Sequence, residues 1–161
     1  MANSCTNMVQ FTGEPSAVAK IYRLFSQIER DPKKDCHQLP KFIADEIRRI
    51  TNLSVQPEYI YYCTPLGPNL QVLQQIADHF KTGFINRYRE PDTYLWGEAS
   101  YANGRAEDIY LDRDDLQLLS CDFDQGRYYY KGKTYDDNFE VLTAMLDDKI
   151  QKARTSYQWG R

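Results

Sequence analysis

The sequence has few of the residues from which metal centres are built. It contains four cysteines (Cys5, Cys36, Cys63 and Cys121) and two histidines, and no two cysteines stand in a Cys-x-x-Cys spacing. Zinc and iron–sulfur frameworks need closely spaced ligand pairs, so neither is expected. In a reducing compartment such thiols stay free and behave as small buried hydrophobic groups. The sequence therefore predicts no metal and no cofactor.

Long apolar runs and an excess of basic charge are also absent. No run of about 18 apolar residues occurs, so a transmembrane helix is not expected. Residues 1–15 have neither the basic start nor the apolar core of a signal peptide, so a cytoplasmic location is expected. The net charge is −3 and the pI about 5.4, whereas nucleic-acid-binding domains are usually strongly basic. Neither a membrane nor a nucleic acid is therefore the expected partner.

The apolar residues that are present recur with two periods, and the period indicates the secondary structure. Helical spacing predicts helices over 15–30, 40–50, 69–82 and 134–150, and alternation predicts strands over 7–13, 58–64 and 84–90. Two hairpins are predicted after these strands, because Asn103-Gly104 and Gln125-Gly126 are turn sequences between strand-like runs. The register of the first hairpin places Trp96 opposite Leu111.

This order of elements predicts an α+β fold. Helices on one face of an antiparallel sheet, entered through a strand–helix–strand unit, match the ferredoxin-like topology, here with an extra C-terminal hairpin and helix. A chain of 161 residues is long enough for one domain with its own core. We therefore expect a single domain over 1–161, in which 31–56 is a loop and short-helix insertion and 154–161 is a frayed tail.

Two stretches carry a resemblance to a known family. The N-terminal "MANSCTNMVQFTGEPSAVAKI" resembles the opening of the YubB-type family of phages, plasmids and integrated elements, through Asn3, Cys5, Asn7, Gly13 and Pro15. The stretch "YCTPLGPNLQVLQQIADHF" and the strand and hairpin after it are similar to the middle of that family. Ser4 stands where family members usually have tryptophan before the cysteine. The resemblance covers about residues 1–30 and 57–112 and implies a ferredoxin-like fold but no particular activity.

The loop over 63–69 is the strongest candidate for a small-ligand or catalytic site. Cys63, Thr64, Gly67 and Asn69 lie between a strand and a helix, where a loop can bind a phosphate or present a reactive thiol. Two prolines remove backbone donors from it, and no basic residue lies between Glu58 and Lys81. The favoured interpretation is a structural corner, and a ligand-binding or enzymatic loop is the alternative.

Charge supplies the main functional indication. Residues 90–124 contain ten acidic and two basic residues. This asymmetry can simply solvate the open side of a sheet, or it can form an acidic surface that attracts a basic protein of the host or of the mobile element. The candidate binding residues are Glu98, Glu107, Asp108, Asp112, Asp114 and Asp115.

Aromatic residues on the strands offer a third possibility, because sheet aromatics can stack single-stranded bases. The candidates are Tyr59, Tyr61, Tyr88, Tyr94, Trp96, Tyr101, Tyr128 and Tyr130. The acidic hairpins count against this alternative, because they would repel phosphates. The sequence as a whole predicts a non-enzymatic accessory protein of a mobile element that binds another macromolecule, expected to be a protein.

Overall fold

The computed structural model describes residues 4–30, 37–43, 49–122 and 124–158. The chain divides into two compact units, one formed by residues up to Leu95 with Ala99–Asp108, the other by Trp96–Glu98 with the residues from Ile109 on. The elements of the first half are β1 (Ser4–Thr12), α1 (Pro15–Glu29), β2 (His37–Gln38), β3 (Arg49–Val55), β4 (Ile60–Pro65), α2 (Leu70–Phe80) and β5 (Gly83–Glu90). They are followed by η1 (Pro91–Thr93), β6 (Leu95–Ala102), β7 (Arg105–Tyr110), α3 (Arg113–Leu116), β8 (Ser120–Asp122), β9 (Arg127–Tyr130), β10 (Lys133–Tyr135) and α4 (Asn138–Gln158).

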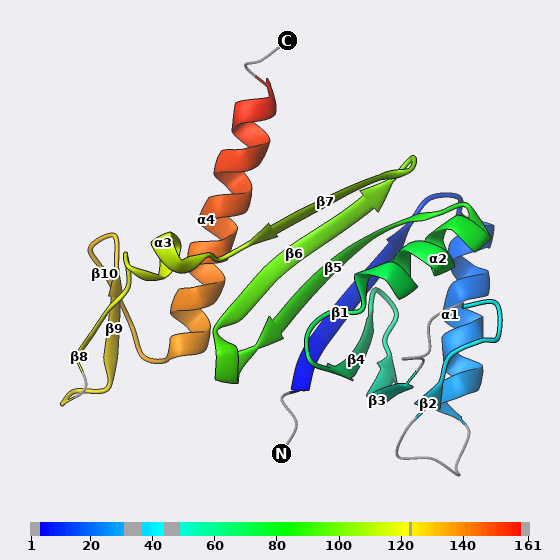
Figure 1. Cartoon of the computed structure of the whole chain (residues 1–161), viewed down its shortest axis with the longest axis horizontal. Helices are drawn as coiled ribbons and strands as arrows, with labels where there is room; N and C mark the ends of the chain where they lie inside the picture. Colours follow the sequence, from blue (N-terminus) through cyan, green and yellow to red (C-terminus); the bar gives the residue numbers. More distant parts are fainter. Residues whose placement is uncertain (1–3, 31–36, 44–48, 123, 159–161) are drawn as a thin grey trace. The chain divides into compact units, whose positions relative to one another are not determined.

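The first unit is a ferredoxin-like α+β structure, as the sequence predicts. Among the described residues its strands lie in the order β2-β3-β4-β1-β5-β6-β7 (Figure 1). β1 pairs antiparallel with both β4 and β5, and β3 pairs antiparallel with β4. The strands β1, β3, β4 and β5, with α1 and α2 between them, therefore form the ferredoxin-like core.

Buried and exposed residues alternate along β1, and the buried ones mark the face of the sheet that the helices cover. Cys5, Asn7, Val9 and Phe11 are buried, whereas the residues between them are exposed or half-buried. Of the buried residues, Cys5, Val9 and Phe11 belong to one core cluster with Ile21 and Phe25 of α1 and with the buried apolar residues of α2. Both helices thus cover the same face of the sheet (Figure 1).

The helix predicted over 40–50 is wrong in its described part. Residues 41–42 form a turn and β3 begins at Arg49, while 44–48 lie outside the described residues. A register shift between Thr51 and Ser54 interrupts the ladder of β3 with β4, and Asn52 has a φ of 52°. Ile50, the last residue of the predicted helix, is instead buried in β3, and the irregularity also buries Leu53 three positions further on, so the two-residue alternation of a regular strand is lost. The insertion over 31–56 therefore supplies strands to the sheet.

The first hairpin forms with the predicted register. Asn103 and Gly104 have φ angles of 51° and 75°, which a tight two-residue turn requires. In the second unit, the Leu111 N–H donates to the Trp96 carbonyl at 2.9 Å, so these two residues face each other as expected.

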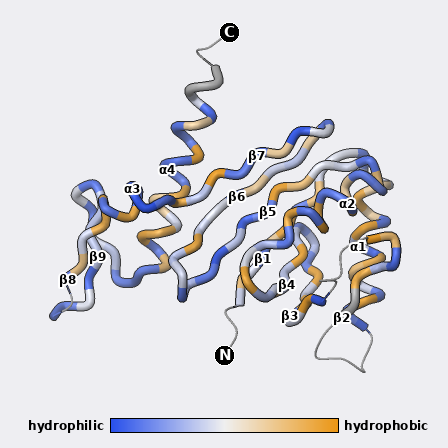
Figure 2. Tube along the Cα trace, viewed as in Figure 1, coloured by the Kyte–Doolittle hydropathy of each residue, from blue (hydrophilic) through white to orange (hydrophobic). Residues whose placement is uncertain are grey.

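The second unit combines a small sheet with a long helix. β8, β9 and β10 form an antiparallel three-stranded sheet, and β8 and β9 are the predicted second hairpin. Apolar and polar residues alternate in turns along α4 (Figure 2). The buried residues of this unit form one cluster: Trp96, Leu111, Tyr130, Val141, Leu142, Met145, Leu146 and Ile150.

Both ends of the C-terminal helix differ from the prediction. Thr134 and Tyr135 pair with Tyr129 and Tyr128 in β10, so the helix begins at Asn138 instead of 134. The Asp137 carboxylate accepts the N–H of Glu140 at 2.7 Å, which satisfies a donor of the first turn. The helix continues to Gln158, so 154–158 are helical and not a frayed tail.

No described helix is long and apolar enough to cross a membrane. The expectation of a single domain over 1–161 stays a prediction.

Gly83 illustrates how closely two strands approach in the first unit. A Cβ at this position would lie 2.5 Å from the carbonyl oxygen of Tyr101 and 2.8 Å from the Thr12 hydroxyl. We expect Gly83→Ala to lower the free energy of unfolding by more than about 2 kcal/mol, because a backbone atom must move. Gly104→Ala is the control: its Cβ would meet nothing within 4 Å, so only the positive φ opposes it, at about 1 kcal/mol. Urea denaturation measures the free energy of unfolding of both variants. An equal decrease in the two variants would contradict the packing argument.

Candidate functional site

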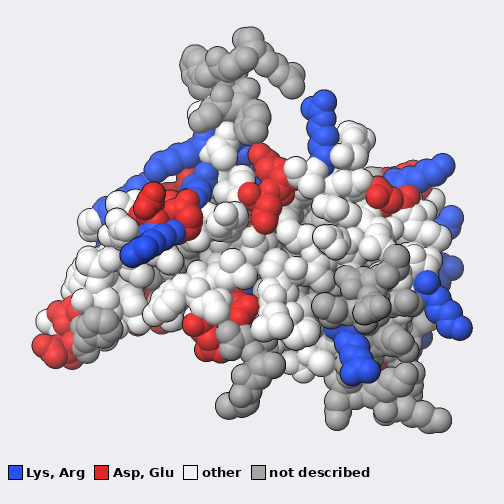
Figure 3. Space-filling view, viewed as in Figure 1, with Lys and Arg blue, Asp and Glu red and all other residues white. Residues whose placement is uncertain are grey.

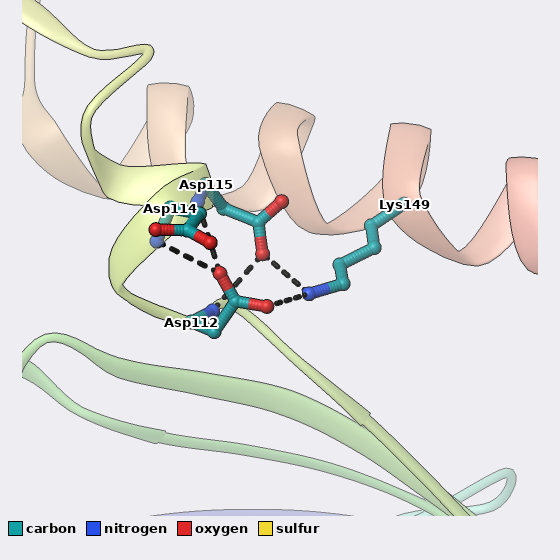
Figure 4. A network of polar contacts seen from close by, with 4 residues as sticks. All are labelled: Asp112, Asp114, Asp115 and Lys149. Carbon is teal, nitrogen blue, oxygen red and sulfur yellow. Dashed lines mark hydrogen bonds and ion pairs between the residues drawn. The ribbon is translucent and has the colours of Figure 1, made fainter.

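Three aspartates of the acidic stretch over 90–124 lie in the first turn of the short helix α3 or cap it. The Asp112 carboxylate caps it by accepting the N–H groups of Asp114 and Asp115, and Asp115 accepts the N–H of Asp112 in return. Lys149 of α4 donates to Asp112 at 2.8 Å and also to Asp115 (Figure 4). Figure 3 shows basic groups close to the acidic ones around α3. Asp112 and Asp115 therefore stabilise the second unit, and Asp114 alone of the three has no ion pair among the described residues.

The remaining acidic candidates have different environments. Glu98 is only 6% exposed and accepts from Arg154 at 2.7 Å, so its predicted place on an acidic surface is wrong. Asp108 is exposed and accepts from the Tyr88 hydroxyl at 2.7 Å. Glu107 is exposed on β7 and has no ion pair within the described part of the chain. Fewer carboxylates are therefore available to bind a partner than the net charge of residues 90–124 suggests.

The loop over 63–69 is occupied by its own polar contacts. The Thr64 hydroxyl donates to the Gly67 carbonyl at 2.8 Å, and the Asn69 amide oxygen accepts from the Tyr62 hydroxyl at 2.7 Å. Cys63 and Thr64 point to opposite faces of β4, since neighbouring residues of a strand alternate, and the Cys63 sulfur contacts the Asn52 amide at 3.7 Å. These contacts agree with a structural corner, and they do not bring Cys63, Thr64, Gly67 and Asn69 to a common point.

A row of buried polar side chains beneath this loop was missed by sequence reasoning. Asn7 and Asn86 are completely buried, and their amides are joined by a 3.0 Å hydrogen bond. The Asn7 amide also donates to the Thr64 hydroxyl at 2.9 Å. The sequence signal for this row is a polar residue at a position of the strand that the apolar alternation assigns to the core, as in β1, β4 and β5. Such a network fixes the mutual register of β1, β4 and β5.

Cys5 lies beside this row and is unsuited to nucleophilic chemistry. Burial raises the pKa of the Cys5 thiol to about 12, and the nearby Glu90 carboxylate contributes to the rise. Only the thiolate is an effective nucleophile. The His79 ring stacks on Phe42 with ring centroids 4.0 Å apart. Cys36 lies outside the described residues.

Several of the aromatic candidates are unavailable for stacking on bases. Tyr88 and Trp96 are each 3% exposed and Tyr130 is 6% exposed, so all three belong to the cores. Tyr101 stacks on Phe84 with centroids 5.8 Å apart. Of the other candidates, Tyr61 and Tyr128 are half-buried, whereas Tyr59 and Tyr94 are exposed, so only part of the predicted set lies in the two cores.

The first unit also contains a half-open cavity of about 400 Å³ that the sequence did not indicate. The end of β1, the end of α2 and the β6–β7 turn contribute its walls. Asp78, Lys81 and Thr82 line it, so charged and hydroxyl groups meet there. No group of three or more His, Cys, Asp or Glu residues in the described ranges is arranged to hold a metal ion.

The ion pairs of Lys149 predict a dependence of stability on pH. The hydrogen bond from Lys149 lowers the pKa of Asp112 from 3.8 to about 2. A depressed folded-state pKa stabilises the protein above the unfolded pKa, and this contribution is lost as the pH falls from about 4 towards 2. We expect Lys149→Met to flatten the fall in unfolding free energy over this range, measured by urea denaturation. The control Lys133→Met should keep the wild-type slope, and equal slopes for all three proteins would contradict the assignment.

The burial of Cys5 predicts a difference in thiol reactivity. With iodoacetamide at about pH 8, we expect Cys5 to be alkylated only when the protein unfolds, because its thiolate is scarce and inaccessible. Cys121 is half-buried and should react faster in the native protein. Peptide mass spectrometry measures the two rates, with the urea-unfolded chain as the reference. Fast alkylation of Cys5 in the native protein would contradict the burial of this thiol.

Comparison with known proteins identifies the family. A family model described as the ferredoxin-like domain in Api92-like protein matches residues 48–130, which is just over half of the chain. The matched region begins immediately before β3 and ends with β9. No curated protein and no solved structure matches the chain. The antiparallel sheet described above and this match agree, and the chain belongs to the family of ferredoxin-like domains found in Api92-like proteins.

Proposed function

We propose that this protein is a non-enzymatic accessory protein of a mobile element that binds a basic segment of another protein. The observation that carries the proposal is the acidic edge strand β7. It is the last strand in the sheet order, and Arg105, Ala106, Glu107 and Asp108 are all exposed. An exposed sheet edge can accept an added strand, whose side chains then confer specificity.

The charge of β7 indicates the kind of partner. Glu107 and Asp108 place two carboxylates on this edge within the first unit, and a partner strand with basic residues would complement them. Asp114 extends the acidic character a few residues further along the chain, in the second unit. Such rim charges contribute mainly to the association rate and to its dependence on salt.

The mobile-element setting rests on the sequence. The resemblance of the N-terminal stretch to the YubB-type family supports it, and a cytoplasmic location is proposed as part of the same setting. In this setting the partner is a basic protein of the host or of the element itself.

The proposal predicts that charge reversal on β7 removes the partner. Tagged full-length protein is used to capture proteins from host lysate at low and at raised salt, and the captured proteins are quantified by mass spectrometry. We expect basic proteins whose capture weakens with salt. Each exposed carboxylate should account for up to about 1 kcal/mol, a factor of about five in affinity. Glu107→Lys should therefore reduce capture by more than this factor, because it also introduces repulsion.

The matched control is Glu58→Lys, an exposed acid of the same unit that lies outside β7. It should capture the same proteins as the wild type. The proposal fails if no protein is captured, if capture does not depend on salt, or if the two charge reversals have equal effects.

A further inference from the structure

The cavity at the end of α2 contains a buried hydroxyl group that needs a partner. Thr82 is 9% exposed, and its Oγ1 has no hydrogen-bond partner among the described residues. A buried polar group without a partner is unfavourable, and most such groups in proteins are paired. Since Thr82 lines the cavity, a molecule bound there can supply the missing hydrogen bond.

Lys81 occupies a strained position in the wall of the same cavity. It ends α2 with φ 56° and ψ 49°, a left-handed conformation that glycine or asparagine usually adopts at this place. Backbone strain of this kind is often found where a side chain is held for function. Lys81 is exposed and has no ion pair within the described ranges, so its ammonium group is available at the cavity.

Asp78 brings the opposite charge to the cavity, one turn earlier on α2. Its Oδ1 accepts from the Tyr101 hydroxyl at 2.5 Å, and Tyr101 in turn stacks on the buried Phe84. The carboxylate is thereby oriented by a side chain that packs on the core. Its second oxygen makes no hydrogen bond among the described residues and can accept from a ligand.

We propose that this cavity binds a small zwitterion of the α-amino-acid class. The ligand carboxylate would lie against the Lys81 ammonium and accept from the Thr82 hydroxyl, and the ligand ammonium would donate to Asp78. A singly charged molecule would meet one like charge in the wall, whereas a zwitterion complements both. A volume of about 400 Å³ is within the range of small-molecule sites and is ample for an amino acid. The site uses none of the carboxylates on β7 or α3, so it is independent of the function proposed above.

The experiment is a thermal-unfolding screen of the full chain with each of the twenty proteinogenic amino acids, with acetate and methylammonium as singly charged probes. A ligand at ten times its Kd should raise Tm by about 3–6 °C. Isothermal calorimetry then measures the affinity of the amino acid with the largest shift for the wild type and for Thr82→Val, Thr82→Ser and Asp78→Asn. We expect Thr82→Ser to bind, and the other two to lose at least about ten-fold in affinity.

The unliganded variants separate a ligand site from a structural role. Thr82→Val removes an unpartnered hydroxyl without changing the side-chain shape, so Tm of the unliganded protein should stay the same or rise. Asp92→Asn, an exposed acid of η1 outside the cavity, is the control and should bind as the wild type does. The inference is overturned if no amino acid shifts Tm, if acetate or methylammonium shifts it equally, or if Thr82→Val binds normally.

Discussion

The pairing of β1 with two neighbours is the constraint on which the first unit depends. β1 lies between β4 and β5, antiparallel to both, so its register determines which residues of three strands face the helices. Val9 and Phe11 contribute apolar surface to this face, while Asn7 links β1 to Thr64 of β4 and Asn86 of β5 through hydrogen bonds. A shift of one residue would expose the apolar side chains and break the amide contacts together.

The acidic segment shows that a charge run in a sequence is not equivalent to a charged surface. Lys149 neutralises Asp112 and Asp115, and Arg154 pairs with the buried Glu98. These bases come from α4, more than thirty residues further along the chain. Stabilisation of the second unit therefore uses part of the acidity that could otherwise attract a partner, whereas Glu107 and Asp108 of the edge strand β7 stay exposed.

The polar groups of the first unit separate into two kinds. Those under the loop over 63–69 bond to one another, although Asn69 Nδ2 and Asn86 Oδ1 have no hydrogen-bond partner among the described residues. These two atoms do not line the cavity at the far end of α2. Those at the far end of α2 are an unpartnered hydroxyl, an ammonium and an oriented carboxylate around a cavity. The second arrangement is the one that can bind a ligand, although the sequence indicated the loop over 63–69 as the stronger candidate for a ligand site.

The sequence by itself determined the elements whose periodicity is regular and whose turns are local. The strands β1, β4 and β5, the first hairpin at Asn103–Gly104, and the apolar stripe of α4 all follow from patterns within a few residues. Only the tertiary structure decided that Ile50 and Leu53 belong to an irregular strand, that Glu98 is buried, and that Asp78, Lys81 and Thr82 surround a cavity with Tyr101. The reason is physical: strand pairing, burial and cavity formation depend on contacts between residues far apart in the chain, and those contacts leave no local period to detect.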